Sequence, residues 1–98
     1  MIFAEIESDK DVASRHSELA HALHSRFTNI RSGLQGDSWF LIIAEGGDVM
    51  VDSLTSMRHQ IKSSDPGAHV QEVIGALREV FKIRVFDSPV SEMHEDEN

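Results

Sequence analysis

Histidines are the residues of this 98-residue chain that could most readily do chemistry, and it has six of them. Glu18, His21 and His24 are three residues apart, and positions with this spacing are neighbours on a helix, so they could share a metal ion. No second Glu-x-x-His supplies further ligands, and His21 lies opposite the apolar stripe of its predicted helix. We therefore expect a solvated helix face here and predict no metal site.

Two further histidines are expected at the edge of the core. His16 falls inside the apolar stripe of its predicted helix, where burial would shift its pKa. His59 lies on the apolar side of a predicted strand, whereas His69 is expected on a helix surface and His94 in the C-terminal tail. No serine or carboxylate can be placed beside these rings from the sequence. We predict no catalytic residue.

Gly36-Asp37-Ser38 resembles the start of a hydrolase motif in which the serine is the nucleophile. In that family the motif follows a strand, but here it precedes one, and the chain is too short for the flavodoxin-like sheet that such enzymes use. The absence of cysteine excludes disulfides, thiolate zinc sites and a cysteine nucleophile. The sequence thus predicts a non-enzymatic protein without a cofactor.

A β-hairpin is the element that the sequence predicts most clearly. Trp39 to Ala44 are six consecutive apolar residues, and because successive side chains point to opposite faces of a strand, both faces should be buried. We therefore expect a central strand and a buried Trp39. Gly46-Gly47 supplies the positive φ angles of a two-residue turn, and the second strand follows at Val49–Val51.

The other elements follow from the spacing of apolar residues. Residues 53–63 fit a strand, a loop or a short helix, and we favour a strand at 57–63. Asp65-Pro66 is typical of a helix start. The remaining predictions are a strand at 1–6, a helix at 9–29, a surface loop at 31–37, a helix from 65 to 81 and a strand at 82–86.

This order predicts one α+β domain at residues 1–88, followed by an acidic disordered tail at 89–98. We favour the order β-α-β-β-β-α-β, with a mainly antiparallel sheet and both helices on one face. The alternative is the ferredoxin-like order β-α-β-β-α-β, which requires residues 48–63 to form one bent strand. With both helices on one side, the second face of the sheet needs another cover, either a homodimer or a partner.

The net charge of −8 argues against binding to nucleic acid or to an anionic membrane, both of which need clustered Lys and Arg. No apolar run approaches the roughly 18 residues of a membrane helix. The first residues lack the basic start of a secretory signal, so we expect a cytoplasmic protein. Half of the charge excess lies in the tail.

These features favour a small acidic protein that acts by occupying a protein partner, for example a bacterial immunity protein or inhibitor that neutralises a toxin or enzyme. Acidic groups would steer it to a basic partner and raise the association rate. The candidate partner-binding residues are Asp37, Glu45, Asp48 and Asp52 around the hairpin and Glu92, Glu95, Asp96 and Glu97 in the tail.

Two alternatives remain. The predicted helix, three-strand meander and second helix over residues 9–81 are similar in element order to type III secretion chaperones, which are small, acidic and cytosolic. That resemblance implies a dimer, although the chain lacks the final helix of that group. The third hypothesis is a weak metal-binding or enzymatic protein that uses the helix histidines.

Overall fold

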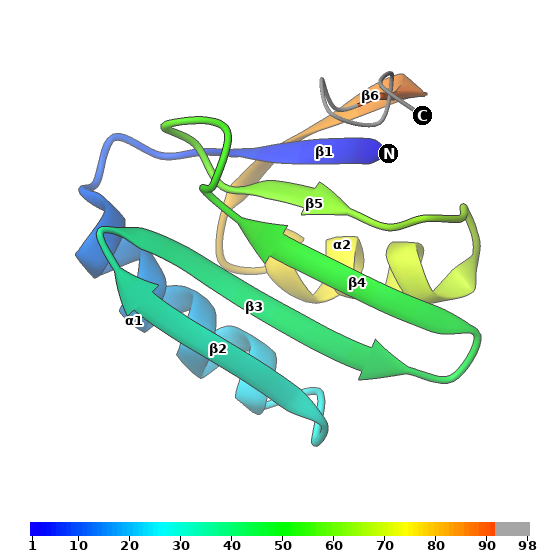
Figure 1. The fold of residues 1–98 in the computed structure, drawn as a ribbon, viewed down its shortest axis with the longest axis horizontal. Coiled ribbons are helices and arrows are strands. Elements are labelled where there is room, and N and C mark those ends of the chain that lie inside the picture. The colour runs from blue at the N-terminus through cyan, green and yellow to red at the C-terminus, as the bar shows by residue number, and fades with distance from the viewer. Residues whose placement is uncertain (92–98) are drawn as a thin grey trace.

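The computed structural model describes residues 1–91, and these form a six-stranded sheet with two helices (Figure 1). The predicted α+β class is confirmed, with one more strand between the helices than expected. The strands are β1 (Ile2–Glu7), β2 (Ile30–Gln35), β3 (Asp37–Ala44), β4 (Gly47–Asp52), β5 (Gln60–Lys62) and β6 (Lys82–Val90), and the helices are α1 (Val12–His24) and α2 (Ala68–Arg78).

All neighbouring strands are antiparallel, in the order β2-β3-β4-β5-β1-β6. The four strands between the helices form a meander, and β1 lies between β5 and β6. The ferredoxin-like alternative is wrong, because residues 48–63 form two strands, β4 and β5, joined by the loop 53–59. The strand β3 has a partner on each side, as expected of a non-edge strand.

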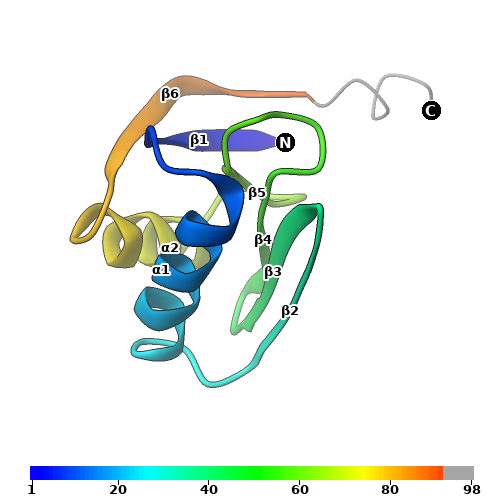
Figure 2. The ribbon, with the colours of Figure 1, turned by 90° about the vertical axis from the view of Figure 1, so that its left-hand side faces the viewer.

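Both helices pack on the same face of the sheet, which curves around them (Figure 2). Alternate residues of β3 and β4 point to the helices, so that Phe40, Ile42 and Val51 are completely buried. Leu19 and Leu23 of α1 and Val73 and Leu77 of α2 fill the same core. The predicted packing of two amphipathic helices on one face is therefore what forms the single core.

Several element boundaries differ from the predictions. The helix α1 is shorter than residues 9–29, because Asp11 is the N-cap and accepts the Ser14 N–H at 2.8 Å. The helix α2 begins after Gly67, not at Asp65-Pro66. Gly46 and Gly47 both have positive φ angles, as predicted. However, the turn of the β3–β4 hairpin consists of Glu45 and Gly46, since Gly47 already pairs with Ala44 as the first residue of β4.

Three strands also differ. The predicted loop at 31–37 is largely the edge strand β2. The strand predicted at 57–63 is reduced to the three residues of β5. The last strand continues to Val90, so residues 89 and 90, assigned to the tail, belong to β6. Residue 91 of the predicted tail follows β6 and is exposed, and residues 92–98 lie outside the described residues.

His69 is buried, so the prediction of a surface position is wrong. Its ring lies against the hairpin turn, where a Cβ on Gly47 would come within 2.8 Å of Nε2. The same Nε2 lies 3.2 Å from the Ser63 hydroxyl and 3.1 Å from the Asp65 carbonyl. His69 thereby connects the start of α2 to the end of the hairpin.

Candidate functional site

The face of the sheet that points away from the helices is the most distinctive surface of the described residues. Trp39, Leu41 and Ile43 of β3 and Met50 of β4 project from it, and each is half-buried. The prediction that β3 is buried on both faces is therefore wrong, because only the helix face is closed. An apolar row of four neighbouring side chains, which we call the open-face row, is left in contact with solvent.

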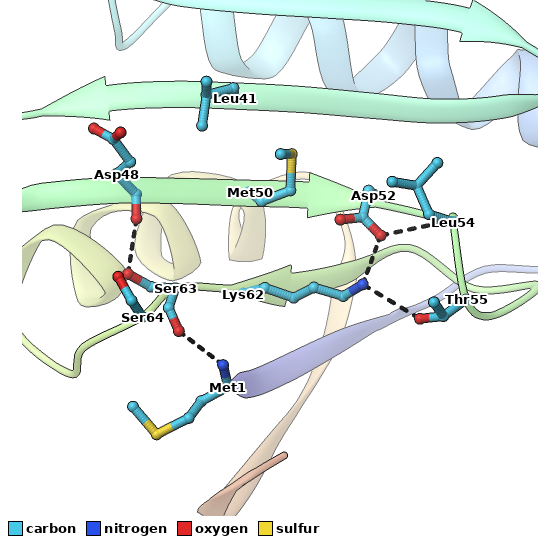
Figure 3. Close-up of a pocket in the computed structure, with 10 residues that line it drawn as sticks. All are labelled: Met1, Leu41, Asp48, Met50, Asp52, Leu54, Thr55, Lys62, Ser63 and Ser64. Atoms are coloured by element: carbon cyan, nitrogen blue, oxygen red, sulfur yellow. Dashed lines mark hydrogen bonds and ion pairs between the residues drawn. The ribbon is translucent and has the colours of Figure 1, made fainter. Parts of the chain in front are cut away.

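A pocket of about 410 Å³ lies beside this row, between the open face of β4 and β5 and the loop 53–55 (Figure 3). Leu41, Met50 and Leu54 form its apolar side. Its polar side contains Asp52 and Lys62, which come from neighbouring strands. The pocket therefore combines an apolar wall with a charged floor.

The charged floor is a buried ion pair. Lys62 Nζ lies 2.8 Å from Asp52 Oδ1, and the two side chains are only 10% and 2% exposed. Lys62 Nζ also donates to Thr55 Oγ1 at 3.3 Å, and the Leu54 N–H donates to the same Asp52 oxygen at 3.1 Å. These bonds hold the start of the loop over the sheet. The carboxylate of Asp52, a predicted partner-binding group, is thus engaged inside the protein.

Hydrogen bonds also order the other end of the pocket. The Ser63 hydroxyl donates to the Asp48 carbonyl at 2.7 Å, and the N-terminal ammonium of Met1 donates to the Ser63 carbonyl at 2.9 Å (Figure 3). The side chain of Asp48 stays exposed at this rim. The pocket is therefore bordered by fixed backbone at both ends.

The predicted acidic residues do not form one cluster. Asp37 begins β3 and Glu45 follows its last residue, so the two lie roughly 25 Å apart along an eight-residue strand. Glu45 lies in the hairpin turn and Asp48 is the second residue of β4, and both are exposed beside the open-face row. The tail candidates Glu92, Glu95, Asp96 and Glu97 lie outside the described residues.

A second polar cluster lies under α1, inside the protein. His16 Nδ1 is 2.7 Å from Ser38 Oγ, and the His16 ring stacks on Phe40 at 4.5 Å between centroids. Burial lowers the pKa of His16. A serine beside a histidine resembles a nucleophile and its base, but Ser38 is completely buried and no described carboxylate binds the ring. In this structure the pair forms a contact between α1 and β3.

His59 is completely buried in the same region, and neither ring nitrogen has a hydrogen-bond partner within residues 1–91. Desolvation, followed by the charges of Arg15 and His16, lowers the pKa of His59 to about 4. The expectation of a core histidine is therefore correct, with deeper burial than a position at the core edge.

Arg15 is a structural residue that the sequence analysis missed. Its guanidinium, almost completely buried, donates to the Met57 carbonyl at 2.6 Å and to the Ser8 carbonyl at 3.4 Å. It also lines a hollow of about 930 Å³ between the start of α1 and the loop 53–58. Its spacing, three residues after Val12 and four before Leu19, was the available signal for burial.

The metal hypothesis gains no support from α1, where His21 and His24 are both exposed. Within residues 1–91 no three His, Cys, Asp or Glu side chains come together as a metal site would require. Neither helix of this part of the chain is long and apolar enough to cross a membrane. Comparisons with protein-family models, curated proteins and solved structures find no match to this chain.

Proposed function

We propose that this protein is a non-enzymatic binding module that occupies the surface of a protein partner, as an inhibitor or immunity protein does. The observation that carries the proposal is the open-face row of Trp39, Leu41, Ile43 and Met50. Contiguous apolar side chains that are only half-buried on the surface of a small domain are typical of an interaction surface. Trp, Met and other large side chains are enriched where partners bury such a surface.

The charges next to this row favour a basic partner. Glu45 and Asp48 are exposed at the hairpin turn, and the whole chain has a formal net charge of −8. Acidic groups at the rim of an apolar patch raise the association rate with a basic surface and make that rate dependent on salt. We therefore assign the apolar row to affinity and these two carboxylates to steering.

Affinity capture from the native host, read by quantitative mass spectrometry, tests the proposal. Met50→Asp places a charge in the centre of the row, and we expect it to lower recovery of the bound partner at least tenfold. Val80→Asp is the matched control, because Val80 is 52% exposed and precedes β6, outside the row. A protein lost with the first variant and kept with the second supports the proposal, whereas equal recovery with both refutes it.

The steering role has its own test, with the captured partner and stopped-flow binding. Asp48→Lys reverses one charge at the rim, and Glu72→Lys makes the same change at an exposed position of α2 on the other side of the sheet. We expect Asp48→Lys to slow association severalfold at low salt and the difference to disappear at high salt. Equal association rates for the two variants would contradict the assignment.

A further inference from the structure

The edge strand β2 has a partner on one side only. It pairs with β3, and no described strand lies on its other side, where it forms one end of the sheet (Figure 1). The N–H and C=O groups of such an edge are a template for pairing with another strand. Only every second residue of β2 can offer its backbone groups to this free edge, because the others bond to β3.

The hydrogen bonds between β2 and β3 determine which residues of β2 point to the free edge. The Ile43 N–H donates to the Asn29 carbonyl at 2.9 Å, and the register places these residues opposite each other at the start of β2. Hydrogen-bonded and non-hydrogen-bonded pairs alternate along an antiparallel ladder, so every second residue after Asn29 also bonds to β3. The N–H and C=O groups of Ile30, Ser32 and Leu34 therefore point away from β3, to the free edge.

We propose that two copies of this chain form a symmetric dimer by antiparallel pairing of β2 with β2, with Ser32 on the two-fold axis. In this register Ile30 faces Leu34 of the second copy, and Ser32 faces its own equivalent. All three outward-pointing residues of each copy then occupy hydrogen-bonded positions. The two sheets become one continuous sheet joined by six backbone hydrogen bonds.

The side chains are self-complementary in this register. On the helix face, half-buried Ile30 would lie against Leu34 of the second copy, which is 42% exposed in the single chain. Apolar pairs directly opposite each other stabilise an antiparallel sheet. The smallest polar side chain of the three, that of Ser32, falls at the axis, where two identical side chains must fit together.

The open face is self-complementary as well. Arg31 would lie opposite Gly33 of the second copy, and the Trp39 ring covers Gly33: a Cβ there would come within 2.8 Å of Trp39 Cε2. The missing side chain leaves the ring accessible from the edge. The guanidinium of Arg31 would thus approach the half-buried Trp39 ring across the interface, a favourable cation–π arrangement.

The opposite edge of the sheet, β6, is protected in a way that β2 is not. It carries Lys82 and Arg84, both exposed, and Pro89, which has no N–H to offer. Charged side chains and proline are the usual means by which edge strands avoid pairing. In β2, Arg31 is the single charged residue and there is no proline. The dimer therefore uses β2.

Cross-linking tests the position of the axis, because the chain has no native cysteine. Residues in a hydrogen-bonded antiparallel pair have Cα atoms about 5.5 Å apart, which a disulfide can span. We expect Ser32→Cys to give mainly covalent dimer under mild oxidation at tens of micromolar, and Ser88→Cys, exposed on β6, to give at least tenfold less. Equal cross-linking of the two variants would overturn the proposal.

Proline at the axis tests the pairing itself. The Ser32 N–H points to the free edge, so Ser32→Pro removes no hydrogen bond of the single chain but blocks the dimer. Sedimentation at about 100 µM should give twice the 11.0 kDa chain mass for the wild type and a single chain for folded Ser32→Pro. The proposal would be refuted by a monomeric wild type or by a dimeric Ser32→Pro. A monomeric wild type would leave the edge of β2 free for the strand of a different partner. If Ser32→Pro does not fold, the cysteine pair decides.

Discussion

Acid should destabilise this protein through His59, and replacement of His59 by leucine should remove that sensitivity. Burial lowers the pKa of His59 from 6.5 to about 4, so the folded state binds fewer protons than the unfolded state between these values. Stability is therefore complete above pH 6.5 and falls as the pH decreases towards 4. Linkage gives a loss of about 2 kcal/mol at pH 5, and of about 3 kcal/mol below pH 4.

Urea denaturation at pH 8, 6, 5 and 4.5 measures this loss. Trp39, the single Trp of a chain without Tyr, reports unfolding by its fluorescence. The other ionisable groups are present in both proteins, so the difference between wild type and His59→Leu reports His59 together with its electrostatic interaction with His16. His24→Leu is the matched control, because His24 is exposed on α1. Its profile should parallel that of the wild type.

Between pH 8 and pH 5 the wild type should lose about 2 kcal/mol of unfolding free energy relative to His59→Leu. The absolute effect of His59→Leu at pH 8 is a separate quantity, since leucine removes two unpaired polar atoms from the interior but changes the shape of the side chain. Parallel profiles for wild type and His59→Leu would show that His59 is protonated equally in both states, and would refute its burial as a neutral ring.

Three further predictions use the same denaturation assay. Ile42→Ala should lower the free energy of unfolding by about 3 to 4 kcal/mol and Ile43→Ala by at most half as much, because Ile42 faces the core and Ile43 the open face. Equal losses would contradict the assigned faces. Lys62→Met should lower the free energy of unfolding by about 3 to 5 kcal/mol, since it leaves the Asp52 carboxylate buried without its counter-charge. Adding Asp52→Leu should recover most of this loss, and no recovery would argue against a buried pair. Gly33→Ala should lower the free energy of unfolding by about 1 to 3 kcal/mol and shift the fluorescence maximum of Trp39, because a Cβ would displace the ring. An unchanged spectrum would mean that the ring does not cover Gly33.

The sequence predicted the elements whose side chains repeat with a clear period. The hairpin and the two helices carry apolar residues at strand and helix spacing, so their existence follows from burial alone. The strand β2 lacks such a pattern, because Arg31, Ser32 and Gly33 occupy its centre. It is a strand because β3 offers it a row of hydrogen bonds, a cause that local sequence does not contain.

The candidate site was predicted less well than the fold, and for a related reason. The buried pair of Asp52 and Lys62 depends on the register of β4 against β5, which the ambiguous residues 53–63 left open. The burial of His69 depends on the hairpin turn that packs on it. Each feature joins residues from different elements, so single-element patterns could not reveal it.

The loop 53–59 lies between the Asp52–Lys62 pair on the open face and the buried Arg15 and His59 on the helix side. Its hydrogen bonds to both regions keep the pocket ordered although the open face has no cover. On the open face, Thr55 is bonded to the buried Lys62. Towards the helices, Arg15 holds the Met57 carbonyl, and the His59 carbonyl accepts the Ile6 N–H at 2.8 Å. The loop is thus fixed from both faces of the sheet without a hydrophobic cover of its own. Leu54, half exposed just before these anchors, is held at the pocket by the hydrogen bond from its N–H to Asp52. If the proposed partner contacts the pocket, Leu54 should therefore require little ordering on binding.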